Sequence, residues 1–178
     1  MASPAPQRDP KAAFLLQSDP MPPHDIAAAG TPRRLLLAAG ALWASPNTVA
    51  GLLLGALGMP LGARAQWRRD DLALVFHRWP WGPGGAMTLG NVILHTGDDL
   101  ETTCCTYAHR AGLCREPQVR LCDHERAHVY QYMALGPLFL PLYLLSGGIS
   151  VRNRFERAAD RYARHGRGWW PWSRTPSL

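Results

Sequence analysis

The feature that most constrains the fold of this chain is a run of 29 residues without a charged side chain, Leu35 to Ala63. The run exceeds the roughly 20 residues that a helix needs to cross the hydrocarbon of a bilayer. Ser45 and Pro46 interrupt it near its middle and predict a turn or a helix cap there. Basic side chains flank both of its ends, at Arg33, Arg34, Arg64, Arg68 and Arg69. Because basic flanks stay on one side of a membrane, this pattern favours an apolar helical hairpin over 33–64 that enters and leaves the bilayer on the same side.

Two other structures fit the same run of residues. One is a single kinked span, in which Asn47 and Thr48 would pack against protein. The other is a helical hairpin buried inside a soluble protein, which the uncharged length disfavours. The sequence therefore predicts association with a membrane and leaves the mode of association open.

The two ends of the chain differ in composition from its middle. Residues 1–32 contain seven prolines among small and polar residues, which is typical of a disordered leader. From Arg152 onward, seven arginines accompany only two acidic residues, and three tryptophans lie within 169–172. Basic charge together with indole rings favours membrane lipid as the partner of the tail, 166–178. A nucleic acid is disfavoured because the chain has no nucleic-acid-binding motif.

Between these ends the sequence predicts a domain over 65–165 of the α+β class, in which helix predominates. Residues 72–76 and 87–94 are rich in strand-forming side chains. The Gly- and Pro-rich segment 79–85 between them predicts a turn, so we expect a small β-hairpin. Residues 97–122 then form a polar loop that holds all four cysteines, either as free thiols or in one or two disulfides.

The remaining segments predict helices. Asp123 is a candidate N-cap for a helix that continues through the residues after it. A second uncharged stretch, 133–151, is broken by prolines and glycines, which favours an interfacial or protein-packed segment over a plain span. Residues 152–164 predict a final helix.

The first pattern that indicates a chemical function is His-Glu-x-x-His at 124–128. Residues four apart share one face of a helix, so His124 and His128 can direct a ring nitrogen at the same ion. Neutral imidazole is a preferred ligand of Zn²⁺, and a catalytic zinc usually has three protein ligands. Glu125 would lie beside this site, where it can act as the general base that activates water and as the acid for a leaving amine.

A third ligand is available 28 positions after His128, in the pattern Glu-x-x-x-Asp formed by Glu156 and Asp160. The two patterns together resemble those of the gluzincin metallopeptidases. That resemblance implies that Glu156 is the third zinc ligand and that Asp160 orients a ligand histidine. Asp160 or His165 is the alternative third ligand, and charge pairing on a solvated helix face is the plainer role for both carboxylates.

Other polar residues near these patterns have weaker assignments. Gln131 lies one turn from His128 and could bond a ligand, although packing fits equally well. Tyr143 could offer a hydroxyl that stabilises an oxyanion, as could two other tyrosines of the region, but tyrosines commonly pack instead. The three remaining histidines of the middle of the chain have no partner at ligand spacing and are expected on the surface or in loops: His77, His95 and His109.

A closer resemblance rests on four segments taken together. They are 43–52 (WASPNTVAGL), 86–90 (AMTLG), 124–132 (HERAHVYQY) and 136–141 (GPLFLP). Their combination is similar to a family of small, uncharacterised bacterial membrane-associated proteins that carry the His-Glu-x-x-His motif. The resemblance implies a place at the bacterial inner membrane, integral or monotopic, and it implies no substrate. The cysteine-bearing loop is an insertion relative to that family.

Three classes of function follow from these expectations, and the last of them is a basic protein that binds lipid or nucleic acid through its arginine- and tryptophan-rich tail. The first is a membrane-associated zinc metallopeptidase that hydrolyses an amide bond, with a peptide or protein as substrate. The second is a structural or zinc-binding membrane protein without turnover, which the short chain favours because little of it remains to build a substrate cleft.

Overall fold

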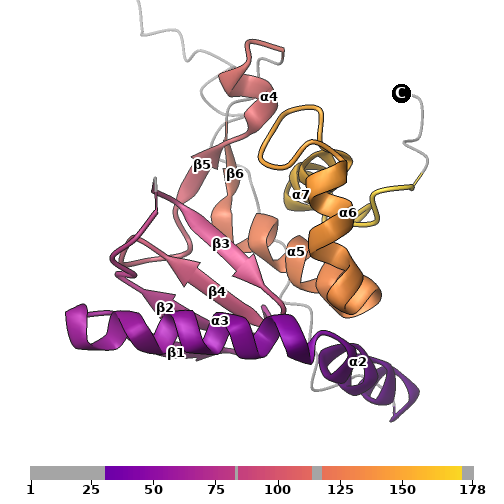
Figure 1. The fold of residues 1–178 in the computed structure, drawn as a ribbon. Helices are drawn as coiled ribbons and strands as arrows, with labels where there is room; N and C mark the ends of the chain where they lie inside the picture. The colour runs from indigo at the N-terminus through magenta and orange to yellow at the C-terminus, as the bar shows by residue number, and fades with distance from the viewer. Residues whose placement is uncertain (1–30, 83, 114–117, 174–178) are drawn as a thin grey trace, which may run out of the picture.

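The structure is a computed structural model, and it describes residues 31–82, 84–113 and 118–173 (Figure 1). The expected leader falls on residues that, apart from its last two, lie outside the described ones. The end of the expected tail, from residue 174, also lies outside them. The described residues form an α+β fold in which helix predominates, as the sequence predicts.

The first two described helices form a bent pair. Helix α2 (Thr31–Trp43) is followed at once by α3 (Ser45–Gly58), with Pro46 in the first turn of α3, and a short 3-10 turn (Met59–Leu61) ends the run. The predicted interruption is confirmed, since one helix ends at Trp43 and the next begins at Ser45. Its cause is Pro46, because a proline fits the first turn of a helix and not its interior. The chain bends by 65° at the break, so the reversal that a hairpin requires is not confirmed. Among the described residues no single helix is long and apolar enough to cross a membrane, whereas α2 and α3 together reach that length and composition.

Four strands form a mixed sheet in the order β1-β2-β4-β3. Their bounds are β1 (Arg64–Arg68), β2 (Ala73–His77), β3 (Ala86–Leu89) and β4 (Val92–His95). Strands β2 and β4 pair in parallel, with Val75 opposite Ile93, and the two outer pairs are antiparallel. The predicted hairpin between 72–76 and 87–94 is therefore wrong. Residues 87–94 divide into two strands at Gly90, whose φ of 62° suits the tight turn to β4, and this turn forms the local hairpin in place of the expected one.

The two faces of this sheet pack against different helices, because side chains alternate along a strand. On one face, Val75 and Ile93 join a buried cluster with Val129 of helix α5 (Leu121–Leu135). On the other face, Phe76 and Val92 meet α3, which runs along the sheet in Figure 1. The sheet thus forms the middle layer of the domain.

Helix α3 approaches the sheet closely through glycines. A Cβ atom at Gly55 would lie 2.3 Å from the ring of Phe76, and one at Gly51 would lie 2.8 Å from Cβ of Val92. Gly58 continues the same buried stripe, three residues after Gly55. With the glycines turned inward, Leu53 and Leu57 of α3 face outward and are each more than 60% exposed.

The predicted polar loop over 97–122 contains regular structure. It holds β5 (Thr103–Cys105), the short helix α4 (Tyr107–Arg110) and β6 (Gln118–Arg120), and β5 pairs with β6 in an antiparallel ladder. The cysteines at 104, 105 and 122 carry free thiols, and the fourth lies outside the described residues. Strand β6 runs directly into α5.

Helix α5 is held against the sheet by a buried ion pair. Arg126 donates to Asp71, which is fully buried, with Nε 2.8 Å and Nη2 2.7 Å from Asp71 Oδ1. Asp123 Oδ1 lies 3.0 Å from Nη1 of the same guanidinium. The prediction that Asp123 is the N-cap is wrong, since the helix begins two residues earlier and Arg120 occupies the cap position.

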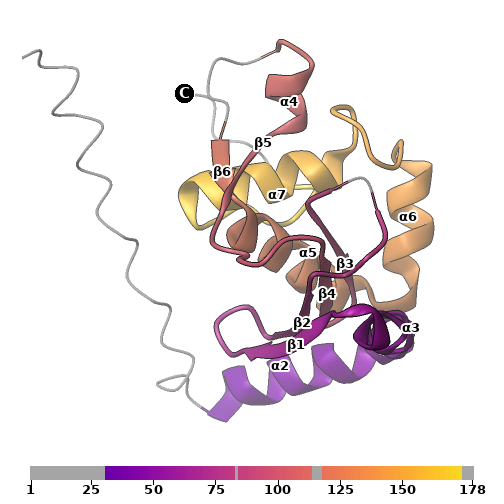
Figure 2. The same ribbon diagram turned by 90° about the vertical axis from the view of Figure 1, so that its left-hand side faces the viewer.

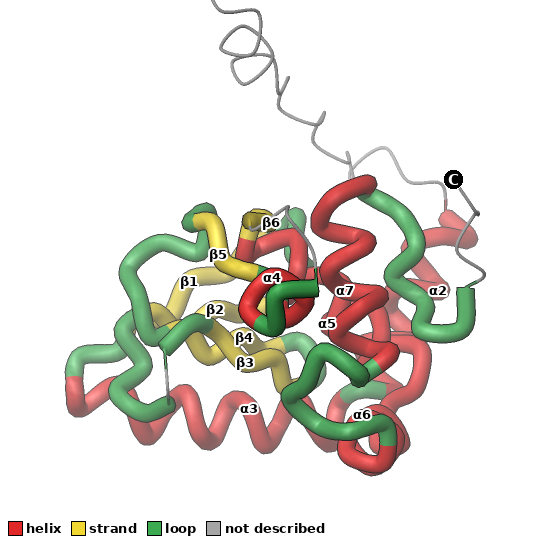
Figure 3. Tube along the Cα trace, turned by 90° about the horizontal axis from the view of Figure 1, so that it is seen from above, coloured by secondary structure: helices red, strands yellow, loops and turns green. Residues whose placement is uncertain are grey.

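The C-terminal elements pack on the far side of α5. After a 3-10 turn (Gly136–Leu138) come α6 (Phe139–Leu145) and α7 (Arg154–His165), which matches the predicted final helix closely. Figure 2 shows α5 between the sheet and α7, and Figure 3 shows the strands gathered on one side with α5, α6 and α7 on the other. Phe139 is buried against Tyr132 and Phe155, while leucines of α6 such as Leu144 and Leu145 are exposed.

Candidate metal centre

Helix geometry brings two imidazoles together on α5. His124 and His128 lie one turn apart, and their Nε2 atoms are 3.2 Å from each other. Both side chains are buried. This follows from the spacing in the sequence, because positions four apart on a helix share a face.

A carboxylate from α7 completes the group. Glu156 Oε2 lies 3.1 Å from His124 Nε2 and 3.6 Å from His128 Nε2. The ligand atoms of the three residues all lie within 4.8 Å of one another, and all three side chains are buried. The group could therefore hold a metal ion.

The outward nitrogen of each imidazole faces an acceptor. His124 Nδ1 lies 3.0 Å from Asp160 Oδ1, one turn after Glu156 on α7, and His128 Nδ1 lies 2.9 Å from Gln131 Oε1. An acceptor beside Nδ1 favours the tautomer with the proton there, which leaves the Nε2 lone pair directed at the centre of the group. The His128 ring is thus oriented as a metal ligand requires, whereas His124 Nδ1 lies close to the Asp160 carboxylate without the geometry of a hydrogen bond.

Gln131 is itself fixed by two carbonyl groups. Its Nε2 donates to the backbone oxygens of Phe155, at 3.2 Å, and of Trp169, at 2.8 Å. These bonds determine which end of the amide faces His128, so Oε1 is the acceptor. Trp169 lies in the segment after α7, which connects the start of the expected lipid-binding tail to the group.

Glu156 is held from the opposite side by Tyr143 of α6, whose hydroxyl donates to Oε1 while Oε2 faces the histidines. The side chain of Asn153 links the end of α6 to the start of α7 through hydrogen bonds. It accepts from the backbone of Phe155 as the N-cap of α7, and its amide donates to the carbonyl oxygens of Tyr143, at 3.1 Å, and of Gly148, at 2.6 Å. The sequence offered no signal that set Tyr143 apart from the other tyrosines.

Glu125, next to His124 on α5, contacts the edge strand β3. Its Oε2 accepts a hydrogen bond of 2.6 Å from Thr88 Oγ1, and both residues are buried. Glu125 and His124 line a small cavity of about 80 Å³, together with Asp160 and Tyr107. A carboxylate and a candidate ligand thus share one polar cavity beside an edge strand. Thr88 was missed by the sequence analysis because its partner lies 37 positions away.

The charges around the group favour a bound cation. Burial alone would lower the pKa of His124, but the carboxylates of Asp160 and Glu156 outweigh it and raise the pKa well above the ordinary 6.5. The pKa of His128 is raised because Glu156 likewise outweighs burial. Burial favours the neutral form of Glu156, yet the two imidazoles hold its pKa below its usual range. The negative charge of these carboxylates can be balanced either by protons on the two imidazoles or by a bound metal ion.

The donor set fits a divalent transition metal. Two imidazole nitrogens and one carboxylate oxygen are ligands typical of Zn²⁺, and three protein ligands leave a position for another group. The two residues that the sequence offered as alternative third ligands do not lie where Glu156 lies. Asp160 lies at the outward nitrogen of His124, and His165 is exposed at the end of α7.

The expectation that His77 and His95 lie on the surface or in loops is wrong. They occupy adjacent strands β2 and β4, both are buried, and their Nδ1 atoms are 3.2 Å apart. Gln66 Oε1 lies 2.9 Å from Nε2 of His77. The error arose because the pairing of two strands, and not spacing along the chain, brings these rings together. His109 lies on α4 and is half-buried.

Comparison of the chain with models of protein families, with curated proteins and with solved structures finds no match. Function is therefore inferred from the chemistry of the group itself.

Proposed function

We propose that this protein is a membrane-associated zinc metallopeptidase-like hydrolase of amide bonds. The observation that carries the proposal is the buried group of His124, His128 and Glu156, whose ligand atoms lie within 4.8 Å of one another. The acceptors at the two outward ring nitrogens support it, because ligand histidines in zinc sites are oriented in this way. The pattern of ligand, orienting aspartate and neighbouring glutamate is similar to that of the gluzincins.

The chain's own residues have the following roles in this proposal. Glu125 takes a proton from the attacking water and later passes it to the leaving amine. Thr88 holds the Glu125 carboxylate in place, and Tyr143 holds Glu156. Zinc, when bound, would supply a Lewis acid that polarises the scissile carbonyl.

A membrane location is part of the proposal, with the bacterial inner membrane as the site. The bent pair α2–α3 presents exposed leucines along both of its helices, among them Leu36, Leu42 and Leu53, all more than 60% exposed. An apolar surface of this extent is typical of contact with lipid or with another protein. Two modes of insertion remain within the proposal: a helical hairpin formed in the bilayer, and a bent pair lying in its interface.

A second candidate function is supported by the size of the cavity. At about 80 Å³ it is much smaller than the roughly 300–1,000 Å³ of ordinary ligand sites. A zinc-binding or structural membrane protein without turnover would need no larger space. The two candidates share the metal group and differ in the role of Glu125.

Metal content and turnover, measured on the same variants, test both candidates. The full chain is purified in detergent without chelator, and zinc is measured by mass spectrometry and hydrolysis with a library of internally quenched peptides. We expect one zinc per chain in the wild type and in Glu125→Gln, with hydrolysis abolished in the variant. His124→Asn should lose both, and Glu101→Gln, an exposed glutamate outside the group, should keep both.

The outcomes separate the candidates. Absence of stoichiometric zinc from the wild type would contradict both. Zinc in the wild type, with hydrolysis no greater than that of Glu125→Gln, would support the non-catalytic candidate.

A further inference from the structure

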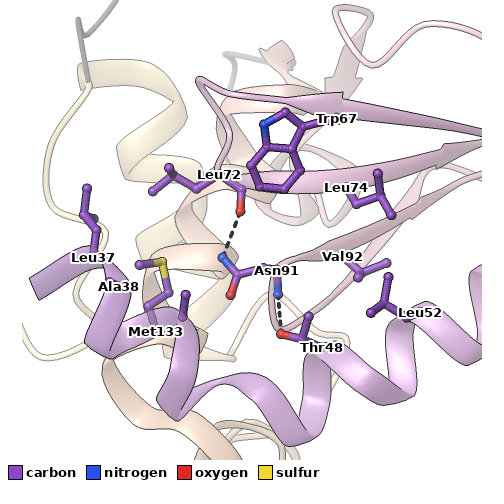
Figure 4. A pocket seen from close by; sticks show the side chains of 11 residues that line it. Leu37, Ala38, Thr48, Leu52, Trp67, Leu72, Leu74, Asn91, Val92 and Met133 are labelled. Atoms are coloured by element: carbon purple, nitrogen blue, oxygen red, sulfur yellow. Dashed lines mark hydrogen bonds between the residues drawn. The ribbon is translucent and has the colours of Figure 1, made fainter. Parts of the chain in front are cut away.

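The bend between α2 and α3 encloses a second cavity, remote from the metal group. It has a volume of about 500 Å³ and lies between the two helices, the sheet and the end of α5 (Figure 4). Its walls are apolar: Leu37 and Ala38 come from α2, Leu52 from α3, Leu74 from β2 and Met133 from α5. A cavity of this size and lining is typical of a site for a small apolar ligand.

One polar atom in this cavity has no partner. The Asn91 side chain donates from Nδ2 to the carbonyl oxygen of Leu72, at 2.8 Å, and its backbone N–H donates to Thr48 Oγ1, at 3.0 Å. Asn91 Oδ1 is buried and accepts no hydrogen bond. Because the Nδ2 bond fixes the orientation of the amide, the atom left without a partner in this wall is an acceptor. A ligand that carries a hydroxyl or an N–H beside its apolar part would satisfy it.

The cavity is continuous with the surface that we assign to the membrane. Leu52 and Trp67 line it and are themselves 39% and 60% exposed, so the walls reach the surface. Indole rings are enriched at the level of lipid headgroups. An acyl chain could therefore enter the cavity from the lipid in which the exposed leucines lie.

Two basic residues lie on the elements that form one end of the cavity. Arg34 precedes Leu37 and Ala38 by one turn of α2 and so shares their face. Arg69 is exposed in the turn between β1 and β2, next to the lining residues Trp67 and Leu72. Leu37 and Leu72 lie at the same side of the cavity in Figure 4. A negative headgroup at this end would meet favourable charge.

We propose that this cavity binds the acyl chain of a lysophospholipid, with the free glycerol hydroxyl donating to Asn91 Oδ1 and the phosphate at the end marked by Arg34 and Arg69. A lysophospholipid combines the three features that the cavity selects, which are one apolar chain, a hydrogen-bond donor and a negative phosphate. The site does not involve the metal group and does not depend on peptide hydrolysis, but it rests on the membrane location proposed above.

Binding of two lipids of equal chain length tests the proposal. The full chain is freed of lipid in a non-ionic detergent. Lysophosphatidylglycerol, which has free hydroxyls, and hexadecylphosphocholine, which has none, are then titrated below their micellar concentrations and followed by native mass spectrometry. We expect one lysophosphatidylglycerol per chain, bound more than tenfold more tightly than hexadecylphosphocholine, because one added hydrogen bond contributes about tenfold and the net negative charge of the headgroup adds to it.

Variants locate the site. Ala38→Phe fills the cavity and should abolish binding, whereas Ala39→Phe, the same change at the next and exposed position of α2, should leave it unchanged. Asn91→Leu should weaken lysophosphatidylglycerol about tenfold and leave hexadecylphosphocholine unaffected, which a general loss of folding would not do.

Three results would overturn the proposal. Equal binding by both Ala→Phe variants would place the lipid on the exposed leucines and outside the cavity. An equal effect of Asn91→Leu on both lipids would remove the hydroxyl contact. Photo-crosslinking from photo-methionine at position 133 to residues 1–30, in place of added lipid, would assign the cavity to the chain's own leader.

Discussion

Each histidine of the metal group uses its two ring nitrogens for different tasks. In His124 and His128, Nε2 faces the centre and Nδ1 faces an acceptor, Asp160 in one case and Gln131 in the other. A charged acceptor makes the imidazole a stronger base than a neutral one does, so the two ligands differ in kind. In the proposed zinc site, His124 would be the ligand whose strength depends on a carboxylate.

We therefore expect Asp160→Asn to weaken zinc binding by roughly 10- to 100-fold without abolishing it. The substitution keeps the size of the side chain and removes the charge that faces Nδ1 of His124. Competition with a fluorescent zinc chelator measures the affinity. The control is Asp98→Asn, in which the exposed partner of Arg78 is changed and the affinity should stay the same. Equal affinities in all three proteins would contradict the role of Asp160.

The buried pair His77 and His95 makes the fold sensitive to acid. Burial lowers the pKa of both rings, and nearby Arg68 lowers that of His77 further, although Asp98 and Asp99 act in the opposite direction. The two rings also oppose each other's protonation. In the unfolded chain both would titrate near 6.5.

The sign of the pH dependence follows from this difference. A histidine whose pKa is lower in the folded protein takes up protons more readily when unfolded, so the contribution of His77 and His95 to the free energy of unfolding falls as the pH drops below 6.5. His124 and His128, whose pKa values are raised, contribute in the opposite direction in the metal-free protein. Urea denaturation of the metal-free proteins at pH 7.5 and 5.5 therefore compares variants. His95→Asn should be more stable at pH 5.5, relative to pH 7.5, than the wild type is, and the exposed His165→Asn should behave as the wild type does. The same change in His95→Asn as in the wild type would contradict the assignment.

At the scale of elements, the contact between α3 and the sheet depends on glycine. The stripe Gly51, Gly55 and Gly58 lets the helix backbone approach Phe76 and Val92. Any larger side chain on this stripe must displace the sheet or the helix. The same stripe turns the leucines of α3 outward, so close packing on one face and exposed apolar surface on the other have one cause.

Gly55→Val should destabilise the protein by about 1–3 kcal/mol, the usual cost of overpacking, because its Cβ would lie 2.3 Å from the ring of Phe76. Ala56→Val is the matched control, since it places the same side chain at the next and exposed position of α3. Thermal denaturation in detergent compares the two. If both variants unfold at the same temperature, α3 does not pack on the sheet as described.

At the scale of the molecule, the metal group joins two elements that are far apart in the chain. The histidines lie on α5, which packs on the sheet, and Glu156 lies on α7, which packs on the far side of α5. The Tyr143 hydroxyl and the Trp169 carbonyl bring α6 and the segment after α7 to the same group. A metal ion bound there would stabilise the C-terminal third of the fold against separation from the sheet.

Zinc should consequently raise the unfolding temperature of the protein, and a chelator should lower it. Saturation at 100 times the dissociation constant corresponds to about 2.7 kcal/mol, if the unfolded chain does not bind zinc. Differential scanning calorimetry with added zinc and then with excess chelator measures the shift, and His128→Asn should show none. A wild type that is indifferent to both reagents would contradict a metal site.

The local features of this protein were determined by its sequence. The break at Ser45 and Pro46, the final helix over 152–164 and the common face of His124 and His128 depend only on neighbours a few residues apart, so patterns along the chain predict them. Glu156 was reached only through the resemblance of the motif, since spacing alone did not distinguish it from Asp160 or His165.

Only the tertiary structure decided the contacts between distant segments. The parallel pairing of β2 with β4, the approach of Thr88 to Glu125 and the meeting of His77 with His95 join residues that are 18 or more positions apart. Such contacts depend on how strands are ordered and how helices pack, and several orders satisfy the same alternation of apolar residues. The cavity beneath the bend of α2 and α3 arises in the same way, because its walls come from six elements that no local pattern connects.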